Sequence, residues 1–238
     1  LIAQSLNLTA EEIKTLLILN VALTIPARVF IGMATDQYGP RKTFSILLLL
    51  CSIPCAMFAL SDNFEQLALA RFLLGFIGAG FVIGIRLVSE WFPANQLGTA
   101  EGIYGGWGNF GSAAAAILLP ALALFIGTYT NDGNGWRWAV GATAVVCFVY
   151  SFIFYFGVRD TPQGATYFKP KSAKAMEVTS VGDFYLLIIM KVPLFGALAL
   201  LSWKLSPDGV SLIGKNTTVF IYFALVAWFM YEIYTAYQ

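Results

Sequence analysis

The chain has 238 residues, of which 58% are hydrophobic and 11% charged, and its net charge is +1. Soluble domains carry about a quarter charged residues, so this composition excludes an ordinary soluble domain and indicates a protein whose outer surface faces lipid. The small net charge gives no general attraction to nucleic acid, and no nucleic-acid partner is expected. The chain lacks histidine, the commonest near-neutral acid–base group and metal ligand. We therefore expect no cofactor, no metal site and no enzymatic activity.

Seven segments are long and apolar enough to cross a bilayer as helices, because a span requires about 20 mostly apolar residues. In chain order they cover residues 12–35, 43–61, 64–91, 97–126, 136–158, 184–203 and 219–237. Thr9 followed by Glu12 predicts a capping box at the start of the first helix. Pro120 is expected to break the fourth segment. The sequence therefore predicts an all-α, polytopic bundle of transmembrane helices.

The sixth segment is the weakest, because Lys191 and Pro193 interrupt it. It is either a bent span or a helix that lies in the membrane interface, and a spanning pair with the seventh segment is favoured. We expect three parts: a transmembrane bundle at 1–158, a polar linker at 159–183 and two further hydrophobic segments at 184–238.

The charges of the connections predict the orientation of the helices. Positive residues are in excess on the side of the linker, which the positive-inside rule places in the cytoplasm. These residues are Arg41, Lys42, Arg159, Lys169, Lys171 and Lys174, against Lys14, Arg137, Lys204 and Lys215 on the opposite side.

Arg28 is the most informative residue, because it lies deep in the first segment. Arginine stays protonated, and a cation at mid-membrane costs at least about 2.5 kcal/mol on insertion scales. It should face the bundle interior and hold an anion, either a substrate or a buried carboxylate. Glu101 is the one carboxylate of the first five segments that comes near a matching depth. The substrate anion is the favoured interpretation.

The fourth segment has glycine at 105, 106, 108 and 111 around Asn109. The glycines predict a helix face on which a neighbouring helix packs closely. The amide of Asn109 can donate to an oxyanion without adding charge. Phe81 in the third segment falls at a similar predicted depth, where its ring would lie beside a planar anion; core packing is the alternative for Phe81 and for the glycines.

Three motifs resemble those of a known family. The loop Gly32-x-x-x-Asp36-x-x-Gly39-Pro40-Arg41-Lys42 and the stretch Arg71-x-x-x-Gly75-x-x-Gly78 resemble two motifs of the major facilitator superfamily. The stretch Gly105-Gly106-Trp107-Gly108-Asn109-Phe110-Gly111 is similar to the glycine-rich motif of its nitrate/nitrite porters, and of cyanobacterial-type permeases in particular.

The resemblance implies a fold and a site. Residues 1–158 would correspond to family helices two to six, most of the first helix being absent, and 184–238 would be an insertion between the two halves. Arg28, Phe81 and Asn109 would bind the substrate. Gly32, Asp36, Gly39, Arg41 and Lys42 would form a cytoplasmic gating loop; from the residues alone, Asp36 and Arg41 are expected to brace helix ends.

The resemblance also implies a function. The parent protein would carry nitrate, and possibly nitrite, across the cytoplasmic membrane by alternating access, with proton symport inward as the expected coupling. This chain would lack the C-terminal half of the transporter. The alternatives are a facilitator for another small anion or a sugar, and a non-transporting sensor or scaffold of the same fold.

Overall fold

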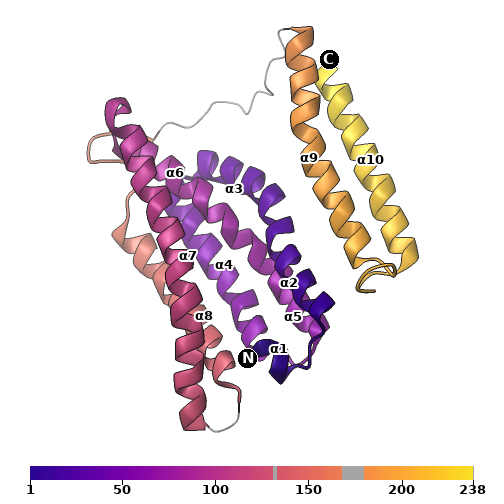
Figure 1. Cartoon of the computed structure of the whole chain (residues 1–238). Helices are drawn as coiled ribbons and strands as arrows, with labels where there is room; N and C mark the ends of the chain where they lie inside the picture. Colours follow the sequence, from indigo (N-terminus) through magenta and orange to yellow (C-terminus); the bar gives the residue numbers. More distant parts are fainter. Residues whose placement is uncertain (131–132, 168–179, 238) are drawn as a thin grey trace.

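The computed structural model describes residues 1–130, 133–167 and 180–237, and these form helices joined by short connections (Figure 1). Lys169, Lys171 and Lys174, which contribute to the predicted cytoplasmic charge, lie outside the described residues. The helices are α1 (Ile2–Ser5), α2 (Ala10–Ala22), α3 (Thr24–Tyr38), α4 (Pro40–Leu60), α5 (Phe64–Leu73), the 3-10 helix η1 (Leu74–Ala79), α6 (Gly80–Trp91), α7 (Ala94–Thr130), α8 (Gly135–Gly157), α9 (Val181–Leu205) and α10 (Lys215–Tyr237).

These helices make up seven candidate membrane spans among the described residues, as the hydropathy pattern predicts. The first span combines α2 and α3, and the third combines α5, η1 and α6. The capping box is confirmed: the Glu12 amide donates to the Thr9 hydroxyl, and the Thr9 amide donates to the Glu12 carboxylate.

The expected break at Pro120 is wrong, because α7 continues through that residue over 37 residues. In lipid a break would expose more backbone N–H and C=O groups than the single hydrogen bond that proline removes. Pro193 likewise lies inside a continuous α9 of 25 residues. At 1.5 Å per residue α9 is about 37 Å long, enough to cross a hydrocarbon core about 30 Å thick.

The core of the bundle lies where α2, α4, α5, α7 and α8 converge, at the end of the bundle away from the linker. Its buried side chains include Leu19, Leu67 and Trp136, and the ring of Trp136 meets the ring of Phe58 edge to face. Leu201 of α9 belongs to the same cluster, so the sixth span is packed against the first five at this end.

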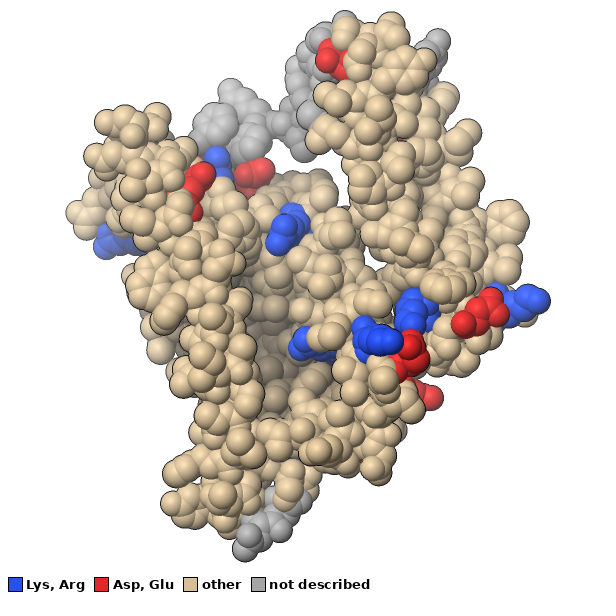
Figure 2. Space-filling view, viewed as in Figure 1, with Lys and Arg blue, Asp and Glu red and all other residues tan. Residues whose placement is uncertain are grey.

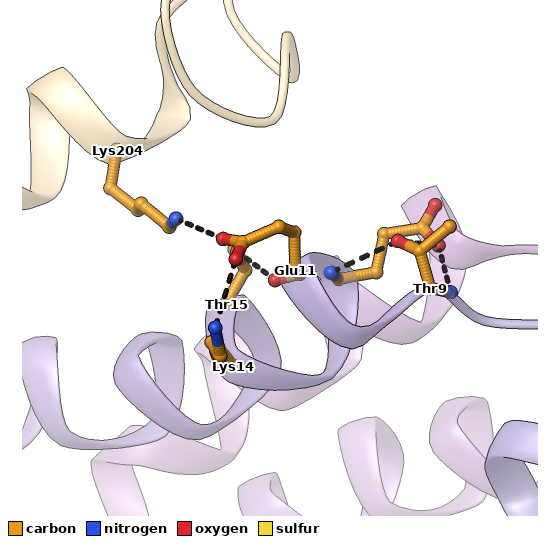
Figure 3. Close-up of polar contacts among 6 residues, drawn as sticks. Thr9, Glu11, Lys14, Thr15 and Lys204 are labelled. Carbon is orange, nitrogen blue, oxygen red and sulfur yellow. Dashed lines mark hydrogen bonds and ion pairs between the residues drawn. The ribbon is translucent and has the colours of Figure 1, made fainter.

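Helices α9 and α10 form an antiparallel hairpin beside α2, with the end of α10 on the side of the linker (Figure 1). Lys191 forms an ion pair with Glu232, and the indole N–H of Trp228 donates to the same carboxylate at 3.1 Å. At the other end of the hairpin, away from the linker, the carboxylate of Glu11 lies between the ammonium groups of Lys14 and Lys204, at 2.9 Å from each (Figure 3). The ion pair between Glu11 and Lys204 joins α2 to α9 and adds to the apolar contact of Leu201.

The face of the molecule seen in Figure 2 is hollowed between α7 on one side and the first and third spans on the other. Charged side chains gather at the margins of this face, and isolated basic side chains stand within it (Figure 2). A basic side chain inside a membrane bundle is costly without an anion beside it. The hollowed face is therefore the candidate location of an anion-binding site.

Candidate functional site

Arg28 lies in α3, about 15 Å from the end of the helix at Tyr38 at 1.5 Å per residue. Its guanidinium carbon is 6.0 Å from the centroid of the Phe81 ring on α6. No carboxylate among the described residues forms an ion pair with Arg28, and this includes the candidate partner Glu101. The structure therefore brings together two of the three predicted binding residues and leaves the cation without a protein anion in the part of the chain it describes.

Tyr104 of α7 is a second neighbour of the Phe81 ring and holds it in place. The two rings stack with their centroids 5.3 Å apart and their planes 24° from parallel. The Tyr104 hydroxyl donates to the Phe81 carbonyl at 3.4 Å. A Cβ at Gly84 would overlap the Tyr104 hydroxyl, so glycine is required for α7 to approach α6 here. Arg28, Phe81 and Tyr104 form a continuous group across three helices.

The structure does not place Asn109 in this group. Its side chain is exposed on α7, and no hydrogen bond joins it to Arg28 or Phe81. Because α7 begins at Ala94, earlier than the hydropathy pattern predicts, Tyr104 lies at the level of Phe81, and Asn109 is about 7.5 Å further along the helix, toward Thr130. Sequence reasoning missed Tyr104; its position directly before Gly105-Gly106 was the available signal.

The glycines of α7 do not form the predicted close helix contact within this chain. A Cβ at Gly105, Gly106, Gly108 or Gly111 would meet nothing within 4 Å among the described residues. Helix α7 contacts α6 and α8 with other residues, at Tyr104 and around Ala123. The glycine face is therefore an open surface of this bundle.

The predicted gating loop is part of a charged cluster at the ends of the first and third spans that lie beside the linker. Asp36 lies 3.7 Å from Arg86, and Arg86 forms an ion pair with Glu90 at 2.9 Å. Asp36 thus contacts the third span rather than capping a helix end, which corrects the expectation. Tyr167 from the linker lies against Arg86 and donates its hydroxyl to the Thr35 carbonyl at 2.7 Å. Burial raises the pKa of Tyr167, which keeps this hydroxyl protonated as a donor.

The tight turn between α3 and α4 is closed by Asp160, a residue that is distant in the sequence but lies against the turn. Gly39 has φ +87°, a conformation that favours glycine, and a Cβ there would stand 2.7 Å from the Asp160 carboxylate. That carboxylate accepts the Arg41 backbone N–H at 2.7 Å and so caps the start of α4. The Arg41 side chain instead lies over the Tyr155 ring, with 5.1 Å to its centroid, so Asp160, rather than Arg41, braces this helix end.

The two remaining residues of the predicted gating loop are Lys42 and Gly32. Lys42 is exposed, and Gly32 packs in ordinary contact with Val82.

The arrangement around Arg28 suits a small planar anion. Arginine presents a planar fork of N–H donors that can hold two oxygens at once. An aromatic face beside the guanidinium provides a flat, weakly hydrated wall. The positive charge beside the Phe81 ring is that of the Arg28 guanidinium.

Seven candidate membrane spans among the described residues, with a hollowed face that carries basic side chains (Figure 2), define a multi-pass membrane protein. The chain matches the Major Facilitator Superfamily over residues 1–237 and belongs to that family.

The relatives share much of the sequence but are longer. The chain is 43% identical over 237 residues to the nitrate/nitrite transporter NrtP of Nostoc punctiforme, an alignment that covers 100% of this chain and 47% of NrtP. It is 42% identical over 253 residues to NrtP of Picosynechococcus sp., with 98% and 47% covered. It is 34% identical over 149 residues to a probable nitrate/nitrite antiporter of Thermus thermophilus, with 61% and 33% covered. The chain spans about half the length of the curated relatives it matches.

Proposed function

We propose that the protein carrying this chain transports nitrate, and possibly nitrite, across the cytoplasmic membrane by alternating access. The observation that carries the proposal is the guanidinium of Arg28 beside the Phe81 ring, inside a membrane bundle and without an ion-paired carboxylate among the described residues. An unpaired cation in a span is costly, and a substrate anion offsets that cost. The named functions of the NrtP relatives support the choice of anion.

In this proposal Arg28 binds two oxygens of the anion, and Phe81 and Tyr104 form the wall beside it. Asn109 donates a hydrogen bond to the anion from a position further along α7. The bundle of residues 1–158 is one half of the transporter, and a second half closes the hollow face. The open glycine face of α7 at Gly105, Gly106, Gly108 and Gly111 supports this division, because such a surface fits a closely packed helix of another bundle.

The remaining parts are assigned in the same proposal. Residues 159–183 are a cytoplasmic linker, and 184–238 is an insertion between the two halves. The alignment with NrtP of Nostoc punctiforme covers the whole chain, whereas the one with the Thermus antiporter covers 61% of it. Coupling to proton import is the expected energy source. The loop with Gly32, Asp36, Gly39, Arg41 and Lys42 gates the cytoplasmic side through the Arg86 cluster.

Uptake of labelled nitrate by cells that produce the full-length protein, in a host without its own nitrate uptake, tests the proposal. Arg28→Lys keeps the charge but loses the planar fork, and we expect it to lose most of the uptake at normal membrane abundance. Arg159→Lys is the matched control, because Arg159 is exposed and contacts Trp91 through its backbone carbonyl. Uptake that is equal in both variants would contradict bidentate binding at Arg28.

A further inference from the structure

The first and third spans both leave regular α-helical geometry where they cross. In the first span α2 ends at Ala22 and α3 begins at Thr24. Pro26 lacks the N–H that would donate to the Ala22 carbonyl, which accounts for a break at this point. In the third span the 3-10 helix η1 lies between α5 and α6. The two irregular segments lie against each other, because a Cβ at Gly75 would stand 2.9 Å from the Leu23 Cβ.

Thr24 ties these two segments together. Its hydroxyl is 3.0 Å from the Asn20 carbonyl oxygen in its own span and 2.9 Å from the Gly75 carbonyl oxygen in η1. A Cβ at Gly78 would stand 2.6 Å from the Thr24 methyl carbon and 2.8 Å from its hydroxyl oxygen. The side chain therefore fills the groove that the two glycines leave, and its hydroxyl bonds across to the third span.

The contact of Thr24 with Gly75 and Gly78 lies about one helical turn from the Arg28–Phe81 contact on both spans. Thr24 and Arg28 are four residues apart, so they share one face of α3. Gly78 precedes Phe81 by three residues on the third span. Further along the same interface, Gly32 faces Val82. A rotation or slip of α3 at Thr24 would therefore displace Arg28 relative to Phe81.

We propose that Thr24 is a positioning residue of the anion site, because its hydrogen bond to Gly75 and its fit against Gly78 fix how the Arg28 guanidinium lies beside the Phe81 ring. This inference rests on the proposed function. Bidentate recognition of a small planar anion depends on orientation, and displacements of about 1 Å are enough to weaken such a site. Thr24 does not touch the anion and acts through Arg28.

Two substitutions separate the hydroxyl from the shape of the side chain. Thr24→Val keeps the branched shape and removes the hydroxyl, whereas Thr24→Ser keeps the hydroxyl. In the full-length protein we expect Thr24→Val to raise the KM for nitrate uptake about tenfold, the effect of losing one hydrogen bond at a buried carbonyl. The maximal rate per molecule in the membrane should change little. Thr24→Ser should restore a KM near that of the unsubstituted protein.

A crosslink measures the packing of α3 on α6 without reference to nitrate. A Cβ at Gly32 would stand 3.7 Å from a terminal carbon of Val82, so Gly32→Cys with Val82→Cys places two sulfurs within reach of a disulfide. The background replaces Cys51, Cys55 and Cys147, which are free cysteines, with alanine. We expect efficient oxidation to the disulfide with Thr24 or Thr24→Ser, and clearly lower yield with Thr24→Val.

The two readouts distinguish the possible failures. A raised KM and a lower crosslink yield in Thr24→Val alone would support the proposal. An unchanged KM in Thr24→Val would overturn it. Equal losses of abundance and maximal rate in both variants, with the KM unchanged, would also overturn it by showing a role in folding alone. Absence of nitrate uptake by the unsubstituted protein would refute the nitrate assignment, and the dependence of the crosslink on the hydroxyl would then decide whether Thr24 sets the packing.

Discussion

Lys191 of α9 and Glu232 of α10 form an ion pair within two helices that are each long and apolar enough to cross a membrane. The pair explains how α9 accommodates a basic residue near its middle, because the lysine has a carboxylate partner on the neighbouring helix. It also favours the arrangement in which both helices span the membrane, since an interfacial α9 could hold Lys191 in water without a partner.

Removing one partner of this pair should damage the hairpin more than removing both. Glu232→Gln leaves the Lys191 charge without its carboxylate inside the membrane, which is strongly unfavourable, whereas Lys191→Met combined with Glu232→Gln leaves no charge. We expect the single variant to reach the membrane at a several-fold lower level than the double variant. Membrane abundance of both, measured by quantitative blotting, checks this. Equal abundance of the two variants would show that the pair does not stabilise the hairpin.

The turn between α9 and α10 should face the outside. Asp208 is exposed in this turn, and a cysteine there, in a background without Cys51, Cys55 and Cys147, should react with a membrane-impermeant thiol reagent on intact cells. Reaction only after the membrane is opened would mean that the turn lies inside and that α9 does not cross.

The hydropathy pattern predicted the spans because lipid imposes a simple requirement on them, about 20 apolar residues with all backbone groups bonded internally. The same requirement explains the errors at Pro120 and at Pro193: a rule from soluble proteins, that proline ends a helix, is weaker where a broken helix would expose polar backbone to lipid. The irregular segments at Leu23 and at η1 were not predicted, because a hydropathy pattern registers neither the missing N–H of Pro26 nor the close approach of the two spans at Gly75 and Gly78.

The candidate site was predicted in part. Depth along the chain was enough to pair Arg28 with Phe81, since both lie about 15 Å from the ends of their helices, at Tyr38 and at Trp91. It was not enough for α7, where the helix start at Ala94 moves Tyr104 to the level of Phe81. The cap on α4 joins Asp160 to Arg41, which are 119 positions apart, and no local sequence pattern predicts such a contact.

The Asp160 cap should contribute measurably to stability. Asp160→Ala leaves the Arg41 backbone N–H without its acceptor, and losing a cap of this kind costs about 1 kcal/mol. Asp160→Asn keeps an oxygen in the same place and should cost less. The thermal unfolding midpoints of the purified full-length variants should therefore fall in the order unsubstituted, Asn, Ala. A midpoint for Asp160→Ala equal to that of the unsubstituted protein would contradict the cap.

The glycine face of α7 should matter for transport although it makes no contact in this chain. Gly108→Leu places a large side chain on a surface that we propose packs against the second half, where overpacking is unfavourable. We expect nitrate uptake to fall about tenfold or more, with the fold of this bundle intact. Leu118→Phe is the matched control on an exposed position of the same helix. Normal uptake by Gly108→Leu at normal abundance would show that nothing packs closely on this face.

The central claim is that Arg28 binds the transported anion, and direct binding tests it without the complications of uptake. A ligand present at 100 times its Kd stabilises the folded state by about 2.7 kcal/mol, so nitrate should raise the thermal unfolding midpoint of the purified full-length protein. Chloride at the same ionic strength should not. We expect Arg28→Gln to abolish the nitrate-dependent rise and Arg159→Gln to retain it. A rise of the same size in Arg28→Gln would contradict the assignment of Arg28 as the anion-binding residue.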